Sequence, residues 1–483
     1  MADELLAVRR EKLDRLRADG IEPFPHAYPG VEPIADVRAA HDGLEAGAET
    51  EARHRVAGRL AARRGQGKMA FLDLVDRSGR IQLQARADVL GAEAMETLLG
   101  LDLGDLIGVD GVAFMSRRGE LTLRVEDWAL LAKSLRPPPE KFHGLQDVET
   151  RYRRRELDLI SNEETRELFA ARARIVTAIR RSLDDDGFLE VETPVLQPLY
   201  GGALARPFTT HHDALDQTMY LRIATELYLK RLIVGGLERV YEIGKNFRNE
   251  GLSPKHNPEF TMLEWYEAYA DYGDAATRLE KVVGAAAEAA GYEGELDFGS
   301  PWRRVTFSEA IREATGVDID ANRDRESLVA AIRSAGVEME GLDHLTWPQL
   351  VDDLLSKHVE PTLVQPTFVL DHPIEISPFA KAHRSKPGAT ERFEAYANGM
   401  EIANAFTELN DPDEQRARFE AQARYAAEGD DESQPYDEAF VQALEQGMPP
   451  TAGLGLGIDR LAMVLTGRDT IRDVVLFPAL RGN

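Results

Sequence analysis

The chain has 483 residues, of which 43% are hydrophobic and 29% charged, and its formal net charge is −26. This composition indicates a globular protein of about two to four domains and excludes disordered and fibrous chains. The chain contains no cysteine, which excludes disulfides, thiolate zinc sites and cysteine nucleophiles. No apolar run approaches the roughly 18 residues of a membrane helix, and the charged N-terminus lacks the apolar core of a secretory signal. We therefore expect a cytoplasmic protein with no membrane partner.

Residues 1–52 predict a helix followed by a connector. Apolar side chains recur at helical spacing among charges up to Gly20, and the stretch beyond is rich in Pro, Gly and Ala. Residues 53–133 then alternate polar and apolar positions in five short segments, with one helical segment at 92–99. Five strands in so short a stretch predict a small β-barrel of the oligonucleotide-binding type, or an unrelated small barrel.

The predicted barrel differs in charge from the rest of this acidic chain. Residues 53–86 hold nine Lys and Arg against two Asp. A local basic face can attract a polyanion even on an acidic protein. The alternative is an ordinary solvated surface.

The remainder of the chain is expected to form a mixed α and β domain over residues 151–483. Three prolines at 137–139 predict a stiff linker over 134–150. An amphipathic helix is predicted at about 162–185, and residues 274–360 predict a helical insertion because they are rich in Ala, Glu, Arg and Leu. The whole chain is therefore predicted to have an α+β multidomain fold.

Residues 239–269 predict two strands joined by the loop GLSPKHN. Side chains alternate along a strand, so Arg248 and Glu250 would share one face of the first strand. Four residues of the second strand are even-numbered and would therefore share one face: His256, Phe260, Glu264 and Tyr266. This set suits a nucleotide, with a guanidinium for a phosphate, a ring for the base and a carboxylate for an exocyclic amine. The alternative is a surface salt bridge on an ordinary hairpin.

A second hairpin is predicted around Asn398-Gly399, a strong two-residue turn signal. In that register Glu394 opposes Ala403, and Glu401 is its diagonal neighbour on the same face. Two such carboxylates can bind Mg²⁺ together with phosphate oxygens, or they are simply two exposed glutamates. Two further polar residues have the opposite parity and reach this face only through a bulge or twist: Asn404 and Glu408.

The segment TAGLGLGIDR at 451–460 places glycines at alternate positions, Gly453, Gly455 and Gly457. If it forms a strand, one face is bare, and a flat ligand or another backbone can approach there. Arg460 follows at the start of a helix, where it can reach a phosphate. The alternative is a tightly packed strand-to-helix corner.

The order and spacing of these segments are more specific than any one of them. The chain resembles the class II aminoacyl-tRNA synthetases through three motifs: Gly187-Phe188 with Pro194, then Phe247 to Glu250 with His256 and Phe260, then the three glycines with Arg460. The barrel ahead of them is similar to that of the aspartyl, asparaginyl and lysyl subgroup. Several strings resemble the bacterial lysyl-tRNA synthetases: KFHGLQD (141–147), GGALARPF (201–208), ELYLKR (226–231) and ANAFTELNDP (403–412).

This resemblance implies a fold and a reaction. The fold is an N-terminal OB-fold barrel followed by an antiparallel-sheet catalytic domain with a helical insertion. The reaction joins lysine and ATP into lysyl-adenylate with release of pyrophosphate, and then passes the lysyl group to the 3′ end of tRNA(Lys) with release of AMP. The implied partners are ATP, L-lysine, tRNA(Lys) and a second copy of the chain in a homodimer formed through motif 1. The implied cofactor is Mg²⁺, two or three ions with ATP.

The resemblance also implies residue roles. Arg248 and Arg460 would be catalytic, and Arg248 would hold both the α-phosphate and the lysine carboxylate. The implied ATP-binding residues are Arg248, Glu250, His256, Phe260, Glu394, Glu401 and Arg460. The implied Mg²⁺ ligands are Glu394 and Glu401. The implied lysine-binding residues are Gly201, Gly202, Glu226, Arg248, Glu264, Tyr266, Asn404 and Glu408. The implied anticodon-binding residues of the barrel are Arg64, Phe71 and Gln82.

The chain departs from the family pattern at a few positions. Thr225 stands where Pro is expected before ELYLKR, Phe379 where Leu is expected, and Met400 where a basic residue is common. Two other interpretations stay open. One is a synthetase relative that charges something other than tRNA, although relatives of that kind lack the barrel. The other is a noncatalytic RNA-binding or regulatory protein, which is expected to lose motif residues that are all present here.

Overall fold

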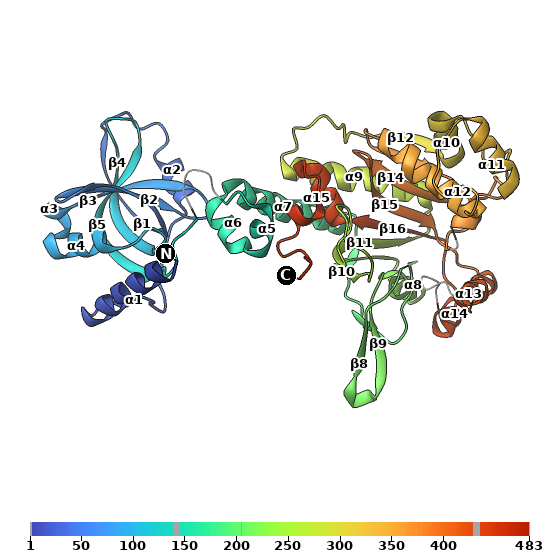
Figure 1. Cartoon of the computed structure of the whole chain (residues 1–483), viewed down its shortest axis with the longest axis horizontal. Helices are drawn as coiled ribbons and strands as arrows, with labels where there is room; N and C mark the ends of the chain where they lie inside the picture. Colours follow the sequence, from blue (N-terminus) through green and yellow to red (C-terminus); the bar gives the residue numbers. More distant parts are fainter. Residues whose placement is uncertain (1, 140–144, 204, 378, 428–434, 483) are drawn as a thin grey trace. The chain divides into compact units, whose positions relative to one another are not determined.

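The computed structural model describes residues 2–139, 145–203, 205–377, 379–427 and 435–482. The chain divides into two compact units, residues 1–166 and 167–483 (Figure 1). Residues 141–144 of the KFHGLQD string and residue 204 of GGALARPF lie outside the described ranges. None of the described helices is long and apolar enough to cross a membrane.

The first unit is built around a closed barrel with the strand order β1-β2-β3-β5-β4. Its strands are β1 (Glu49–Gln66), β2 (Met69–Val75), β3 (Arg80–Arg86), β4 (Leu106–Met115) and β5 (Leu121–Ala132). Alternate residues point into the barrel, as Ile81, Leu83 and Ala85 of β3 do, because side chains on a strand alternate between its two faces. The predicted five-stranded barrel is confirmed.

A short helix of the first unit was not expected from the sequence. The helices here are α1 (Ala2–Ala18), α2 (Ile34–Ala40), α3 (Ala87–Leu90), α4 (Ala92–Gly100), α5 (Val148–Arg153) and α6 (Arg155–Ser161). Helix α2 lies in the stretch interpreted as a connector, and it buries Ile34 and Val37 in the barrel core. Seven residues with two buried apolar positions are too few to show a helical period against a Pro- and Gly-rich background.

The second unit contains an eight-stranded sheet in the order β12-β13-β14-β15-β16-β11-β10-β6. Its strands are β6 (Leu189–Glu190), β10 (Arg239–Phe247), β11 (Glu259–Ala268), β12 (Arg303–Thr306), β13 (Thr367–Leu370), β14 (Arg392–Ala397), β15 (Met400–Thr407) and β16 (Thr451–Gly457). Only the two end pairs are parallel, so the central strands form the predicted antiparallel sheet. A smaller sheet joins β7 (Leu196–Gln197), β9 (Gln217–Leu221) and β8 (Thr209–His212), and β8 and β9 project as a hairpin (Figure 1).

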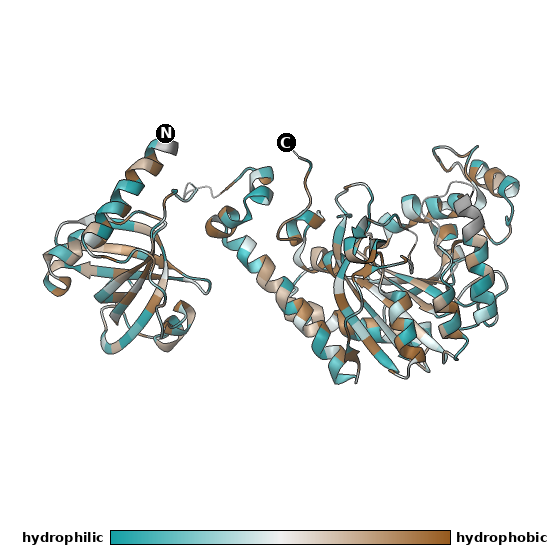
Figure 2. Ribbon diagram, turned by 90° about the horizontal axis from the view of Figure 1, so that it is seen from below, coloured by the Kyte–Doolittle hydropathy of each residue, from teal (hydrophilic) through white to brown (hydrophobic). Residues whose placement is uncertain are grey.

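Helices pack against both faces of the large sheet and at its edges. They are α7 (Glu163–Asp185), α8 (Glu226–Val234), α9 (Tyr272–Ala290), α10 (Phe307–Thr315), α11 (Arg325–Ser334), α12 (Trp347–Leu354), α13 (Pro412–Ala427), α14 (Glu438–Leu444), α15 (Ile458–Thr466) and α16 (Ile471–Val474). Single helical turns lie at Asp213–Leu215, Leu355–Val359, Glu360–Thr362 and Ile374–Ile376. Helix α7 alternates hydrophilic and hydrophobic residues along its length (Figure 2), as an amphipathic helix packed on a core does.

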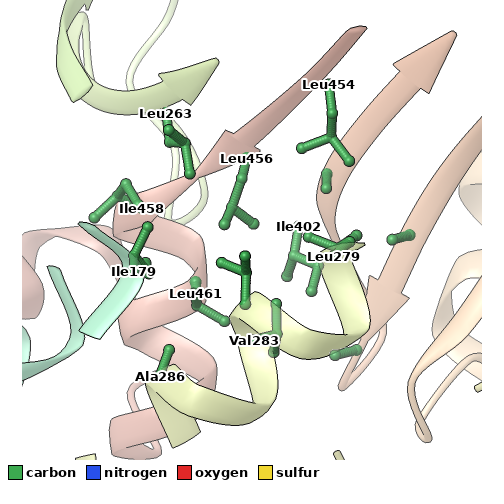
Figure 3. Packing of buried hydrophobic residues seen from close by; sticks show 14 of the residues in the cluster. Ile179, Leu263, Leu279, Val283, Ala286, Ile402, Leu454, Leu456, Ile458 and Leu461 are labelled. Atoms are coloured by element: carbon green, nitrogen blue, oxygen red, sulfur yellow. The ribbon is translucent and has the colours of Figure 1, made fainter. Parts of the chain in front are cut away.

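The main core lies between the sheet and helices α7, α9 and α15. Leu454 and Leu456 of β16 point toward Val283 of α9 and Leu461 of α15 (Figure 3). These leucines occupy the even positions of β16, so its three odd-numbered glycines face the opposite side of the sheet. The strand therefore packs firmly on one face and leaves its other face bare, as its sequence predicts.

The hairpin of β14 and β15 corrects one predicted register. Asn398 and Gly399 form the predicted turn, both with positive φ. However, Glu394 pairs with Asn404 and not with Ala403, because a bulge shifts the register between Ala395 and Tyr396. The extra residue on β15 is Ile402, which is buried in the core. The bulge therefore places Asn404 on the same face as Glu394, whereas a regular hairpin would place it on the opposite face.

The first hairpin also differs from its prediction. Strand β10 ends at Phe247, so Arg248 and Glu250 lie in the loop and not on the strand. His256 likewise precedes β11, which begins at Glu259. The Arg248 amide still donates to the Pro258 carbonyl at 2.9 Å, after which the pairing stops. Gly251 and the prolines of this loop favour irregular backbone over a longer ladder.

Candidate active site

The glycine strand β16 aligns polar residues of its neighbours into one row across the sheet. Glu264 of β11 pairs with Gly455, Gly455 pairs with Asn404 of β15, and Asn404 pairs with Glu394 of β14. Directly paired residues in a sheet point to the same face. In the next row Tyr266 pairs with Gly453. The glycine strand β16 therefore has Glu264 and Tyr266 of β11 on one side and Asn404 of β15 on the other.

Gly453 is required by the packing of this face. A Cβ atom there would lie 1.9 Å from Glu408 Oε1 and 2.5 Å from Tyr266 Cε1. A Cβ at Gly455 would meet nothing closer than Met262 Cε at 3.6 Å, an ordinary contact. Glu408 therefore reaches over β16 only because position 453 carries no side chain.

A pocket opens above this face and contains most of the predicted site residues. Those that line it are Gly202, Glu226, Arg248, Glu250, His256, Phe260, Glu264, Tyr266, Glu401, Asn404, Glu408 and Arg460. Two residues predicted to bind ATP or lysine do not line it. Gly201 faces a neighbouring cavity beside Tyr228 and Arg231. Glu394 accepts from Arg392 at 2.6 Å and from the Tyr396 hydroxyl at 2.5 Å.

One end of the pocket is acidic and almost dry. The Glu226 and Glu264 side chains are 5% exposed and Glu408 is 1% exposed. Burial, followed by the charge of Glu226, raises the pKa of Glu264 to about 7. Burial also raises the pKa of Glu408. Carboxyls in such surroundings are stabilised in their charged form by a cationic ligand, so this end is suited to ammonium groups.

Two donors hold Glu264 in place at the acidic end. The Thr225 amide donates to Glu264 Oε1 at 3.1 Å, and the Tyr266 hydroxyl donates to Oε2 at 3.3 Å. Gly202 approaches this end with φ of +87°, and a Cβ there would lie 2.9 Å from Glu226 Cβ. The GG turn is therefore fitted closely against the first turn of α8.

The other end of the pocket is cationic and aromatic. The Arg248 guanidinium lies 5.2 Å from the centre of the Phe260 ring. Its Nε is buried and has no hydrogen-bond partner among the described residues. Arg460 donates to Glu401 Oε2 at 2.8 Å and lies 3.1 Å from His256 Nε2. Burial, then the nearby Arg460 charge, lowers the pKa of His256, so its ring is neutral at pH 7.

Carboxylates gather beside this cationic end. Burial raises the pKa of Glu360 to about 7, a net value in which the charge of Lys255 opposes the rise and the charges of Glu401 and Glu394 add to it. Burial and the charge of Glu394 likewise raise the pKa of Asp352. Carboxylate oxygens are the donors that Mg²⁺ prefers. No cluster of three or more His, Asp or Glu in the described part of the chain is arranged to hold a metal alone.

Sequence comparisons place the chain among known proteins. Residues 147–481 match the family described as tRNA synthetases class II (D, K and N), and residues 54–131 match the OB-fold nucleic acid binding domain. A lysine–tRNA ligase of Moorella thermoacetica is 52% identical over 487 residues, covering 99% of this chain and 98% of that protein. The lysine–tRNA ligase of Chloroflexus aurantiacus is 52% identical, covering 99% of this chain and 98% of that protein. That of a Synechococcus species is 50% identical, covering 99% of each chain.

The chain belongs to the lysine–tRNA ligase family of class II tRNA synthetases. The recognised family and the two predicted folds are confirmed by these matches. The chain is thus an aminoacyl-tRNA synthetase, and these relatives align with it over nearly their whole length.

In the barrel of this family member, the predicted anticodon residues share one outer face. Arg64 of β1 pairs with Phe71 of β2, and Gln82 of β3 lies one row away, opposite Asp73. Asp73 is buried and holds Arg64 at 3.1 Å. Thr122 donates to Gln82 Oε1 at 3.1 Å. The ring, guanidinium and amide are therefore already positioned on the barrel surface.

Three residues of the catalytic unit were missed by the sequence analysis. Lys255 of the GLSPKHN loop lines the pocket and lies 3.9 Å from Glu360. Arg392 donates to both Asn404 and Glu394 and so links two predicted site residues. Lys230 is buried beside Glu226, and the spacing of four residues between them within the ELYLKR string was the available signal.

Proposed function

We propose that this chain is a lysine–tRNA ligase that activates lysine with ATP and then transfers the lysyl group to tRNA(Lys). The observation that carries the proposal is the polarity of one pocket. It has a cationic and aromatic end at Arg248 and Phe260, and a dry acidic end at Glu226, Glu264 and Glu408. ATP suits the first end and a substrate with two ammonium groups suits the second.

Arg248 lies where the two reacting groups would meet. In the first half-reaction a lysine carboxylate oxygen attacks the α-phosphorus, the bond to the β-phosphate oxygen breaks, and pyrophosphate leaves. The carboxylate is already ionised, so the chain needs no general base, and catalysis consists of positioning and charge neutralisation. Arg248 would hold the α-phosphate and the carboxylate together, and its unpartnered buried Nε supports that role.

The remaining ATP contacts follow from the same end of the pocket. Phe260 would stack on adenine, and Glu250 would accept from its exocyclic amine. Arg460 and neutral His256 are adjacent and would bind the outer phosphates. Glu401 lies within hydrogen-bond distance of Arg460, so phosphate and metal contacts would share this corner.

The carboxylates of this corner fit Mg²⁺. Glu394 and Glu401 would hold the ion, with Glu360 close enough to contribute its charge. Each Glu394 oxygen accepts a hydrogen bond, one from Arg392 and the other from Tyr396, and keeps a second lone pair for a cation. Mg²⁺ supplies charge neutralisation on the phosphates when it is bound. We infer two or three ions with ATP.

The acidic end would bind lysine at both of its ammonium groups. Glu226 and the backbone at Gly201 and Gly202 would meet the α-ammonium. The proposed contacts of the ε-ammonium are Glu264, Tyr266 and Glu408, with Asn404 nearby. A neutral side chain in this place would leave buried charges unpaired, which disfavours such substrates.

The barrel would read the anticodon of tRNA(Lys). Phe71 would stack on an unpaired base. Gln82 would contact the edge of that base, and Arg64 would contact the phosphate of its nucleotide. We further propose a homodimer formed through the segment around Gly187 and β6. The cytoplasm is the proposed compartment because both ATP and tRNA are used there.

Lysine-dependent ATP–pyrophosphate exchange tests the proposal. The purified chain is assayed with Mg²⁺ and lysine, beside aspartate, asparagine and ornithine. Exchange with lysine alone is expected, followed by charging of tRNA(Lys). A folded protein that exchanges with none of the four, or better with aspartate, would overturn the assignment.

Lysine recognition is expected to depend on pH through Glu264. Its pKa of about 7 is raised by burial, and it is surrounded by Glu226, the Thr225 amide, Tyr266 and, more distantly, Arg248. Because the charged form binds an ammonium, kcat/KM for lysine should rise as pH increases from 6 to 8. The ATP KM should change little over the same range. A profile for lysine that is flat or falls over this interval contradicts the assignment of Glu264.

Thr225 gives a sharper test of the same carboxylate. Proline has no amide hydrogen, so Thr225→Pro removes the 3.1 Å donor to Glu264. We expect the lysine KM at pH 7 to rise at least about 10-fold, because a hydrogen bond to a charged group contributes about 1.5–3 kcal/mol. The rise of kcat/KM for lysine with pH should also shift to higher pH. Thr225→Ala keeps the amide and is the control, so equal effects of the two substitutions would show that this donor is unimportant.

A further inference from the structure

Lys230 is a buried cation behind the acidic end of the pocket. Its side chain is 1% exposed. Its ammonium lies 2.5 Å from Glu226 Oε1 and also forms an ion pair with Glu408 Oε2. Both carboxylates line the pocket, whereas Lys230 does not. Despite burial, the charges of Glu226 and Glu408 raise the pKa of Lys230, so it remains a cation.

Packing alone does not account for a cation at this position. The buried face of α8 otherwise carries apolar side chains such as Leu229 and Ile233. Replacing a buried ion pair by apolar groups of similar volume is often neutral or stabilising. The two carboxylates also come from different elements: Glu226 from the first turn of α8, and Glu408 from the residue after β15. Lys230 therefore connects α8 to the end of β15.

We propose that Lys230 is a positioning residue for amino-acid selection. It fixes the separation between Glu226 and Glu408, and thereby the distance between the two ammonium groups that the pocket accepts. This inference rests on the proposed function, in which Glu226 meets the α-ammonium and Glu408 the ε-ammonium. Lys230 touches neither ammonium group and acts only through these carboxylates.

Lys230 also sets the charge of this end of the pocket. Three carboxylates are buried here, at Glu226, Glu264 and Glu408. When a cationic substrate keeps all three ionised, Lys230 compensates one of them and leaves two negative charges, which equals the number of ammonium groups on lysine. Without it a third carboxylate would remain unpaired in a dry site, and the pKa of Glu408, already raised by burial, would rise further.

Lys230→Met tests the proposal, because methionine has a similar shape and no charge. The assay is lysine-dependent pyrophosphate exchange, with lysine and ornithine as substrates, from pH 6 to 9. We expect the lysine KM to rise about 10²-fold while the ATP KM stays within about twofold. The preference for lysine over ornithine should fall. The pH dependence of kcat/KM for lysine should shift to higher pH by about one unit. The reason is that Glu408 loses its cationic partner while Glu226, Glu264 and Tyr266 still face it.

The contrary outcomes are distinct. A purely structural lysine would lower the melting temperature but leave the pH profile and the preference for lysine unchanged, which would overturn the proposal. A change of the lysine and ATP KM values together would also overturn it. The wild-type chain is run in parallel: if it fails to exchange with lysine, the proposed function itself fails, and the Lys230 proposal falls with it.

A second variant covers the case in which Lys230→Met does not fold. Lys230→Arg keeps the charge but carries a longer, forked head, so it should change the preference for lysine over ornithine at least tenfold without moving the pH profile. Retention of the wild-type preference would count against positioning. Lys133→Met is the matched control: Lys133 is likewise buried between acids, Asp102 and Asp105, but it belongs to the other unit. It should reduce stability and leave the lysine KM unchanged.

Discussion

Replacing Arg248 with alanine is expected to lower kcat/KM for lysine-dependent pyrophosphate exchange about 10³-fold. The guanidinium lies beside Phe260 at the cationic end of the pocket, and its buried Nε has no partner among the described residues. It is thus the group available to neutralise the α-phosphate and the lysine carboxylate, which repel each other until they react. Steady-state exchange kinetics with both substrates varied measure the loss.

Two variants make this result specific. Arg248→Lys keeps the charge but not the fork that can hold two anionic groups at once, so it should recover only part of the rate. Arg333→Ala removes an exposed arginine of α11 that pairs with Asp343, and it should retain activity within about twofold. An Arg248→Ala enzyme with nearly normal kcat/KM would show that another residue joins the reacting groups.

Gly453→Ala is expected to damage the lysine site selectively. The added Cβ would lie 1.9 Å from Glu408 Oε1 and 2.5 Å from Tyr266 Cε1, so both must move. Displacement of such groups by about 1 Å costs about 10²-fold, and we expect that rise in the lysine KM. Overpacking should also lower the free energy of unfolding by about 1–3 kcal/mol. Exchange kinetics and thermal melts measure the two effects.

Gly455→Ala is the matched control on the same strand. Its Cβ would lie 3.6 Å from Met262 Cε and 3.8 Å from Glu264 Cγ, which are ordinary contacts. Glu408 should therefore keep its place, and the lysine KM should rise far less. If the two substitutions raise the lysine KM equally, the effect belongs to the strand as a whole and not to the approach of Glu408.

The sequence was most informative where backbone chemistry is strict. Asn398-Gly399 predicted its turn, because few other residue pairs adopt positive φ at both positions. The alternating glycines of β16 predicted a bare face because the leucines between them require the core. The barrel followed from a simple alternation of polar and apolar positions.

The details that the sequence did not reveal depend on tertiary packing. The bulge at Ile402 places one more apolar side chain in the core, and only the neighbouring helices make that favourable. The position of Arg248 in a loop follows from where the ladder between β10 and β11 stops. The partners of Lys230 come from residues 226 and 408, which no local pattern brings together.

The row from Glu264 through Gly455 and Asn404 to Glu394 crosses four neighbouring strands. Adjacent strands are about 4.8 Å apart, so the row spans roughly 14 Å, a length set by hydrogen bonding between strands and not by any side chain. Each position along it belongs to a different segment of the chain. A substitution at one strand can therefore alter what is recognised at that point while the spacing of the other positions is preserved. Substrate choice and reaction chemistry can change independently in such a sheet.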